Sequence, residues 1–204
     1  MPFGANVALG PTIQVGNDQA IRTGPQFSFD VGHDEVRFIY TVRLNDGDLA
    51  LATSVCTLDL QDAFGCNWQP GWGTGASLAV TNHAGVQFNP VLKWAPSQTG
   101  EYWQVVYQTT DPELPGTVAV RQALLDRGTS GQPVFRSEPL VPARQACPSL
   151  GSQYWGDYDD LQQYGRNAIG RPLYVTAFTQ SYAGCDDQQY WDSHHVHVGS
   201  IVFP

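Results

Sequence analysis

Alternation of apolar and polar residues is the strongest pattern in the chain. Residues 36–43 are rich in β-branched and aromatic side chains, and an Asn-Asp-Gly-Asp segment at 45–48 separates them from a second apolar run at 49–54. A period of two is typical of a strand with one buried face, and an Asp-Gly pair favours a hairpin turn. The sequence therefore predicts an antiparallel strand pair at this place.

Two more strand pairs are predicted in the same way. They lie at residues 102–107 with 118–124 and at 173–178 with 195–202. A short apolar and aromatic segment precedes each of the three pairs, at 25–30, 88–94 and 154–159. The units recur about every 60 to 70 residues, which indicates weak internal repetition of a small β-sheet. The alternative is the ordinary patterning of a β-sandwich.

Composition agrees with an all-β domain. The 204 residues include 21 Gly and 14 Pro, and only 14% are charged, which favours short strands joined by tight turns over long helices. With 42% hydrophobic residues, one sizeable core is expected, so we predict a single all-β domain over residues 1–204. Residues 65–77 and 126–148 are expected to be long, mostly irregular surface loops.

Charge and hydropathy exclude two classes of partner. The net charge is −9, Lys93 is the sole lysine, and the arginines are scattered along the chain, which argues against nucleic acid and anionic lipid. No apolar run reaches the roughly 20 residues of a membrane-spanning helix, so we expect no membrane insertion.

The four cysteines predict disulfides and therefore a secreted or cell-surface protein. Three connectivities are open, and we favour Cys56 with Cys66, which closes a short loop after a strand, and Cys147 with Cys185. No cysteine or histidine spacing matches a zinc finger, so a thiol-held metal is the weaker alternative.

One short segment resembles a known family. Residues 154–161, Tyr-Trp-Gly-Asp-Tyr-Asp-Asp-Leu, resemble the WGDY-type segment in late blades of sialidase-like (BNR-repeat) β-propellers, and the strand expected at 172–178 follows as it does there. The segment Phe88-Asn89-Pro90, followed by an apolar strand, looks like the inner strand of the preceding blade. The family's Asp-box is absent, because residues 54–59 lack its Gly and Trp.

The resemblance implies a propeller-like array of about three antiparallel sheets, which the disulfides predicted from the four cysteines would stabilise. Three blades are fewer than the four or more that close a propeller ring. The chain would then be a fragment, an open array, or a protomer that completes a ring by self-association, which makes a homo-oligomer one expectation.

A sialidase-type active site would need an arginine cluster, a Tyr/Glu nucleophile pair and an acid/base Asp. The weak candidates are Asp157 for the carboxylic acid and Arg171 for an anion contact. Arg37 and Arg121 are expected to face solvent from alternating strands. Because this set is incomplete, a glycoside hydrolase is the alternative and not the leading hypothesis.

Two groups of residues could hold a metal, although no cofactor is required. Asp157, Asp159 and Asp160 offer oxygen ligands for Ca²⁺; the alternative is that they cap backbone amides or face water. His195 and His197 share one face of a strand and could bind a transition metal, or else face solvent without one.

Aromatic residues in the expected loops and strand ends favour ligand binding. Such rings can stack on sugar faces, although any single Trp is more often a core residue. The residues concerned are Trp72, Tyr154, Trp155, Tyr158 and Trp191. The leading hypothesis is an extracellular recognition module that binds carbohydrate or a cell-surface ligand through these aromatics. The alternatives are a sialidase-like hydrolase and a self-assembling structural surface protein.

Overall fold

The computed structural model describes strands and turns in fourteen stretches of the chain. The described residues are 12–16, 19–23, 27–43, 49–58, 66–68, 78–79, 85–96, 101–110, 117–126, 138–145, 153–156, 160–170, 172–181 and 194–202. Every regular element among them is a β-strand, which confirms the all-β prediction. None of these residues belongs to a helix that could cross a membrane.

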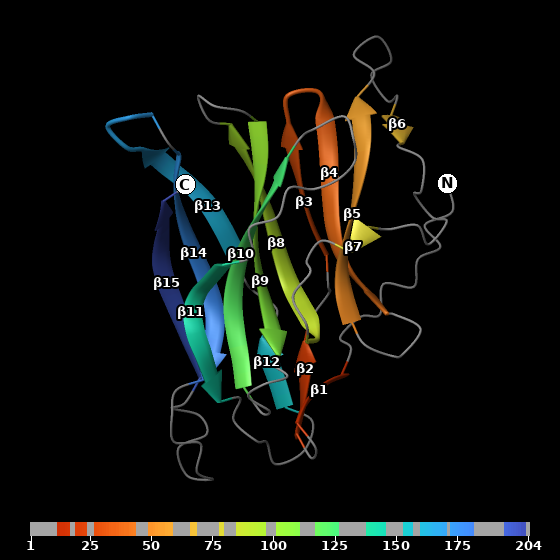
Figure 1. Ribbon diagram of the computed structural model, residues 1–204, viewed down its shortest axis with the longest axis vertical. Helices are drawn as coiled ribbons and strands as arrows, with labels where there is room; N and C mark the ends of the chain where they lie inside the picture. Colours follow the sequence, from red (N-terminus) through yellow and green to blue (C-terminus); the bar gives the residue numbers. More distant parts are fainter. Residues whose placement is uncertain are drawn as a thin grey trace.

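Three antiparallel meanders form the body of the molecule (Figure 1). Sheet I is built on β3 (Phe27–Gly32), β4 (Glu35–Arg43) and β5 (Leu49–Leu58). Sheet II is built on β8 (Gln87–Pro96), β9 (Glu101–Thr110) and β10 (Thr117–Asp126). Sheet III consists of β13 (Asp160–Arg166), β14 (Pro172–Ser181) and β15 (His194–Val202).

The three strand pairs expected from the sequence are all present. They are β4 with β5, β9 with β10 and β14 with β15, and each pair belongs to a different sheet. The long unbroken ladders of these pairs follow from their β-branched and aromatic residues, which pack well on a pleated surface. Repetition of one small antiparallel unit is therefore a property of the fold.

Shorter strands extend this frame. Sheet I continues through β6 (Cys66–Trp68) and β7 (Leu78–Ala79), and sheet II continues through β11 (Glu138–Gln145). A small mixed sheet joins β1 (Thr12–Gly16), β2 (Gln19–Thr23) and β12 (Gln153–Gly156). The strands β6 and β11 thus lie inside stretches that we expected to be mostly irregular. Prolines interrupt the alternation of apolar and polar residues in β11, which explains why the sequence did not predict it.

The third unit begins at a different strand from the one expected. Tyr154 pairs in parallel with Arg22 of β2, whereas the first strand of sheet III is β13. Leu161 is the one buried side chain of β13, and its other residues are half-buried or exposed. A strand that buries a single apolar residue shows no alternation of apolar and polar residues. The sequence pattern therefore predicted the aromatic segment at 154–159 as the start of the third unit.

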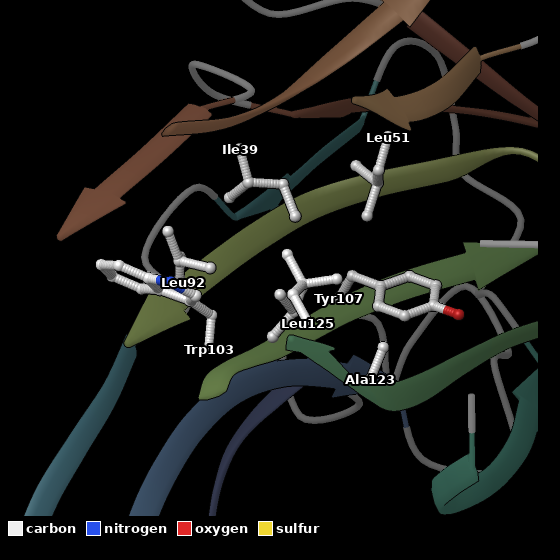
Figure 2. Packing of buried hydrophobic residues seen from close by; sticks show 8 residues of the cluster. Ile39, Leu51, Leu92, Trp103, Tyr107, Ala123 and Leu125 are labelled. Carbon is white, nitrogen blue, oxygen red and sulfur yellow. The ribbon is translucent and has the colours of Figure 1, made fainter. Parts of the chain in front are cut away.

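Sheet II lies between the other two sheets (Figure 1). One of its faces packs on Ile39 and Leu51 of sheet I through Leu92, Trp103 and Tyr107, as Figure 2 shows. The opposite face packs on sheet III, where Val91 and Val106 meet Leu161, Tyr174 and Phe178. Because both of its faces are covered, β9 is buried at every position from 103 to 110.

Candidate functional site

The open edge of sheet II is covered by side chains of sheet I. The strand β8 lies at the edge of its sheet, and such a strand presents N–H groups without a ladder partner. The N–H of Leu92 donates to the Ser28 hydroxyl over 3.1 Å, and the N–H of Trp94 donates to the Asp30 carboxylate over 2.8 Å. Ser28 and Asp30 therefore point from β3 toward sheet II and fix the two strands side by side.

Side chains of sheet III donate hydrogen bonds to backbone carbonyls of the same strand, β8. The hydroxyl of Tyr174 donates to the Trp94 carbonyl over 2.8 Å, and the Arg166 guanidinium donates to the Pro96 carbonyl over 3.3 Å. A proline at this edge removes one donor that would otherwise need a partner. Side chains from two sheets thus bind one strand, so the contact between the three sheets is polar as well as apolar.

Tyr174 is a structural donor in this junction. Burial raises the pKa of its hydroxyl above the ordinary value of 10, the Arg166 charge lowers this pKa, and the Asp30 charge raises it further. The side chain is fully buried and its proton is engaged with a carbonyl. A buried neutral phenol cannot meet a substrate, so this residue does not provide the tyrosine nucleophile of a sialidase-type site.

A second polar cluster lies between sheets I and II. Glu35 accepts hydrogen bonds from the Trp103 indole N–H over 2.7 Å and from Arg37 over 3.2 Å. The Arg37 guanidinium lies 5.6 Å from the centre of the Trp103 ring, and Trp94 meets that ring edge-on. Glu35 and Arg37 are each only 7% exposed. The expectation that Arg37 faces solvent is therefore wrong, because its face of β4 is the one that packs on sheet II.

The opposite face of sheet I is apolar, and it is open along β3, whereas on β5 the same face is closed because Cys56 and Ala52 are fully buried. We call it the aromatic face and define it by Phe27, Phe29 and Val31 of β3 and by Val36, Phe38 and Tyr40 of β4, which pair across the two strands. The three β3 side chains are 48%, 53% and 51% exposed. Phe29 and Phe38 stack with their ring centres 5.4 Å apart. No residue of this face is charged, and its polar group, the Tyr40 hydroxyl, lies 3.0 Å from the Ser54 hydroxyl.

In an ordinary surface ribbon the polar side chains face solvent and the apolar ones face the interior. In β3 and β4 this orientation is inverted. Ser28, Asp30, Glu35 and Arg37 point toward the interior contact with sheet II. Phenylalanine and valine alternate with them along β3, and alternate residues of a strand point to opposite faces. An outward apolar face of this kind typically marks a surface that another molecule covers.

Asp160 is the one expected calcium ligand among the described residues. It begins β13, and its carboxylate accepts hydrogen bonds from the Leu161 N–H over 2.8 Å and from the Gln162 amide over 3.1 Å. Asp157 and Asp159 lie outside the described residues, so calcium binding stays a prediction. Within the described ranges, no three His, Cys, Asp or Glu side chains come close enough together to hold a metal ion.

The remaining expected site residues are placed only by their backbone, where they are described at all. Tyr154 and Trp155 belong to β12, beside β2. His195 and His197 belong to β15, opposite Gln180 and Phe178. Outside the described residues lie Trp72, Tyr158, Arg171 and Trp191. The structure therefore neither assembles nor separates the aromatic ligand site and the histidine pair.

Of the four cysteines, Cys56 and Cys66 lie in described strands. Cys56 of β5 is opposite Trp68 and Cys66 of β6 is opposite Leu58, so the two cysteines are diagonal neighbours in one ladder. Cys147 and Cys185 lie outside the described residues.

Sequence reasoning missed the aromatic face, although its pattern was visible. The run Phe27-Ser28-Phe29-Asp30-Val31 alternates strictly, which predicts a strand with one apolar side. Alternation does not indicate whether the apolar or the polar side faces the rest of the molecule. Comparison with protein-family models, with curated proteins and with solved structures finds no match to the chain.

Proposed function

We propose that this protein is a non-catalytic extracellular interaction module of propeller-like construction, and that it docks a protein surface on its aromatic face. The single observation that carries the proposal is the inverted β3–β4 ribbon. Its polar side chains are used between sheets I and II, and on its outer face Phe27, Phe29 and Val31 are about half exposed.

The free energy available from this face supports docking. Complete burial of a Phe or Val side chain contributes about 1.5 to 3 kcal/mol, so covering a half-exposed one contributes about 1 kcal/mol. Three such side chains in a row on one strand therefore provide a contiguous binding surface of several kcal/mol. An exposed row of this kind is also an aggregation hazard unless a partner covers it.

Contacts among the first strands of the three sheets support the propeller-like arrangement. β8 of sheet II contacts both β3 of sheet I and β13 of sheet III, so the first strand of the central meander lies between the first strands of the other two. The sheets pack face to face away from these strands. Radial repetition of small antiparallel sheets has this geometry.

An apolar protein partner suits the aromatic face better than a glycan does. Sugar sites combine stacked rings with polar groups that bind the hydroxyls. Here the Tyr40 and Ser54 hydroxyls are close enough to bond each other. Carbohydrate binding stays a prediction that rests on Trp72, Tyr154, Trp155, Tyr158 and Trp191.

The register of β5 and β6 supports the extracellular assignment. Cys56 and Cys66 occupy diagonal positions on adjacent strands, and no cysteine in the described part of the chain is a free thiol. Diagonal neighbours of a regular ladder are about 7 to 8 Å apart, just beyond the usual Cα separation in a disulfide, so a small local shift of the short strand β6 brings the two thiols together. A Cys56–Cys66 bridge in an oxidising compartment follows as part of the proposal.

Substitution at the centre of the aromatic face tests the proposal. If a protein covers the aromatic face, Phe29→Lys should abolish that association. If the face is open in solution, Phe29→Lys should abolish binding of the apolar dye anilinonaphthalene sulfonate. Ile169→Lys is the matched control, because Ile169 is 62% exposed in the turn between β13 and β14, away from this face. If Phe29→Lys changes neither property, the proposal is wrong.

A further inference from the structure

We infer that the partner on the aromatic face is a second copy of this chain, which presents the outer face of its sheet III. The inference rests on the proposed function and adds the identity of the partner and the face it uses. Two copies related by a two-fold axis would then form two equivalent contacts, each between sheet I of one copy and sheet III of the other.

The outer face of sheet III follows from the alternation along β14. Tyr174 and Phe178 pack against sheet II, and Thr176 between them is buried. The residues that alternate with these, Leu173, Val175 and Ala177, point to the opposite face and are half-buried. Sheet III therefore has a second row of apolar side chains, on its outer side.

The rows of apolar side chains on the two outer faces are complementary in size. The aromatic face has large rings on β3 and β4, whereas the β14 row consists of Leu, Val and Ala. Large side chains opposite small ones interdigitate, which is how facing sheets fill the space between them. Neither row contains a charged residue, and the polar Asp160 and Gln162 border the β14 row on the same outer face.

The stacking order also favours this pairing. Sheet II is covered on one face by sheet I and on the other by sheet III, so these outer faces are the two ends of one stack. The strand β8 contacts both β3 and β13, and an array of sheets that radiates from such a row of first strands closes when more sheets continue it. Closed arrays of this type typically contain about four to eight sheets. Two copies supply six.

The alternative is a dimer in which the two aromatic faces meet each other. That arrangement places rings against rings and leaves the β14 row of both copies uncovered. It also makes a distinct prediction, because substitutions in sheet III would then have no effect on association.

Light scattering coupled to size-exclusion chromatography tests the inference on the non-reduced protein. The unmodified chain should elute with twice its mass of 22.3 kDa at micromolar concentration. Phe29→Lys and Val175→Lys should each raise the dissociation constant of the dimer at least about tenfold, as loss of a central apolar contact does. Each also makes the net charge less negative, so added repulsion cannot explain the loss. Ile169→Lys should leave the dimer intact.

Mixing the two variants gives the sharpest result. A heterodimer of Phe29→Lys with Val175→Lys contains one contact with both original faces and one contact with both substitutions. The mixture should therefore associate more tightly than either variant alone, and circular dichroism should first show that each variant is folded. Dissociation by Phe29→Lys but not by Val175→Lys would overturn the inference in favour of aromatic faces meeting each other.

A monomeric unmodified chain would also overturn the inference, and the dye then separates it from the proposed function. Dye binding by the monomer that Phe29→Lys abolishes would show an available aromatic face whose partner is a different protein. A monomer whose dye binding does not depend on Phe29 would overturn both statements.

Discussion

The two faces of the β3–β4 ribbon reverse the usual distribution of polarity. On the face toward sheet II, Asp30, Glu35 and Arg37 are held by hydrogen bonds to backbone and indole N–H groups or to each other. On the aromatic face, Phe27 and Phe29 are about half exposed. The difference teaches that hydrogen bonds to a neighbouring sheet, as well as hydrophobicity, decide which face of a strand is buried. It also supports the proposal that another molecule covers the aromatic face.

Removal of the buried carboxylate should have the largest effect on the inner face. Glu35→Ala leaves Arg37 and the Trp103 N–H without the acceptor that both use, and breaking a buried ion pair in this way costs about 3 to 5 kcal/mol. Urea unfolding of the variant and the unmodified protein measures this loss. Glu35→Gln retains an oxygen acceptor and should lose less, so equal losses would show that the acceptor is not what matters.

Added volume at Gly32 should have the next largest effect. A Cβ atom at this position would overlap the ring of Trp94, which packs against the core between sheets I and II. Gly32→Ala should therefore destabilise the fold by about 1 to 3 kcal/mol through overpacking. Gly165→Ala is the matched control, because a Cβ atom there meets nothing within 4 Å. Equal thermal unfolding midpoints for the two variants would contradict this account of the packing.

Tyr174 should make the stability of the protein depend on pH in the alkaline range. Below pH 10 the folded and unfolded states both keep the phenol proton, so the raised pKa has no effect on stability there. Above pH 10 the unfolded state loses its proton first, and the free energy of unfolding should fall by about 1.4 kcal/mol per pH unit because of this group. Chemical denaturation at a series of pH values from 7 to 11 measures the slope.

Tyr174→Phe is the variant for that series. At pH 7 it should cost about 1 kcal/mol, because the hydrogen bond to the Trp94 carbonyl is lost. Above pH 10 its stability should decline less steeply than that of the unmodified protein. Parallel slopes would show that the other tyrosines account for the alkaline loss.

Much of the fold could be predicted from the sequence because its central strands have long, regular patterns. The pairs β4–β5, β9–β10 and β14–β15 were predicted as antiparallel neighbours from alternation and turn residues. β13 was missed because Leu161 is its one buried side chain. The strands of the three predicted pairs are recognisable from their own residues, whereas the position of β13 is determined by its pairing with β14.

The candidate site was less predictable because it depends on which side of a strand meets a neighbour. Alternation along β4 allowed Arg37 to face solvent, and the indole of Trp103, 66 positions further along the chain, is what makes its burial favourable. The apolar side of β3 had an equally clear pattern. Its exposure follows from Ser28 and Asp30, whose hydrogen bonds to β8 turn the phenylalanines outward.

The smallest effect on stability should come from the aromatic face. Phe29→Lys removes one stacked pair with Phe38 from a half-exposed position, so the free energy of unfolding of the single chain should fall by only about 0.5 to 1 kcal/mol. The measurement needs protein dilute enough to be monomeric, because a covered face would add the free energy of association. At higher concentration the loss should grow if a second copy covers Phe29. A loss as large as that of Glu35→Ala in dilute protein would mean that Phe29 belongs to the core of one chain, and the contrast between the two faces would be wrong.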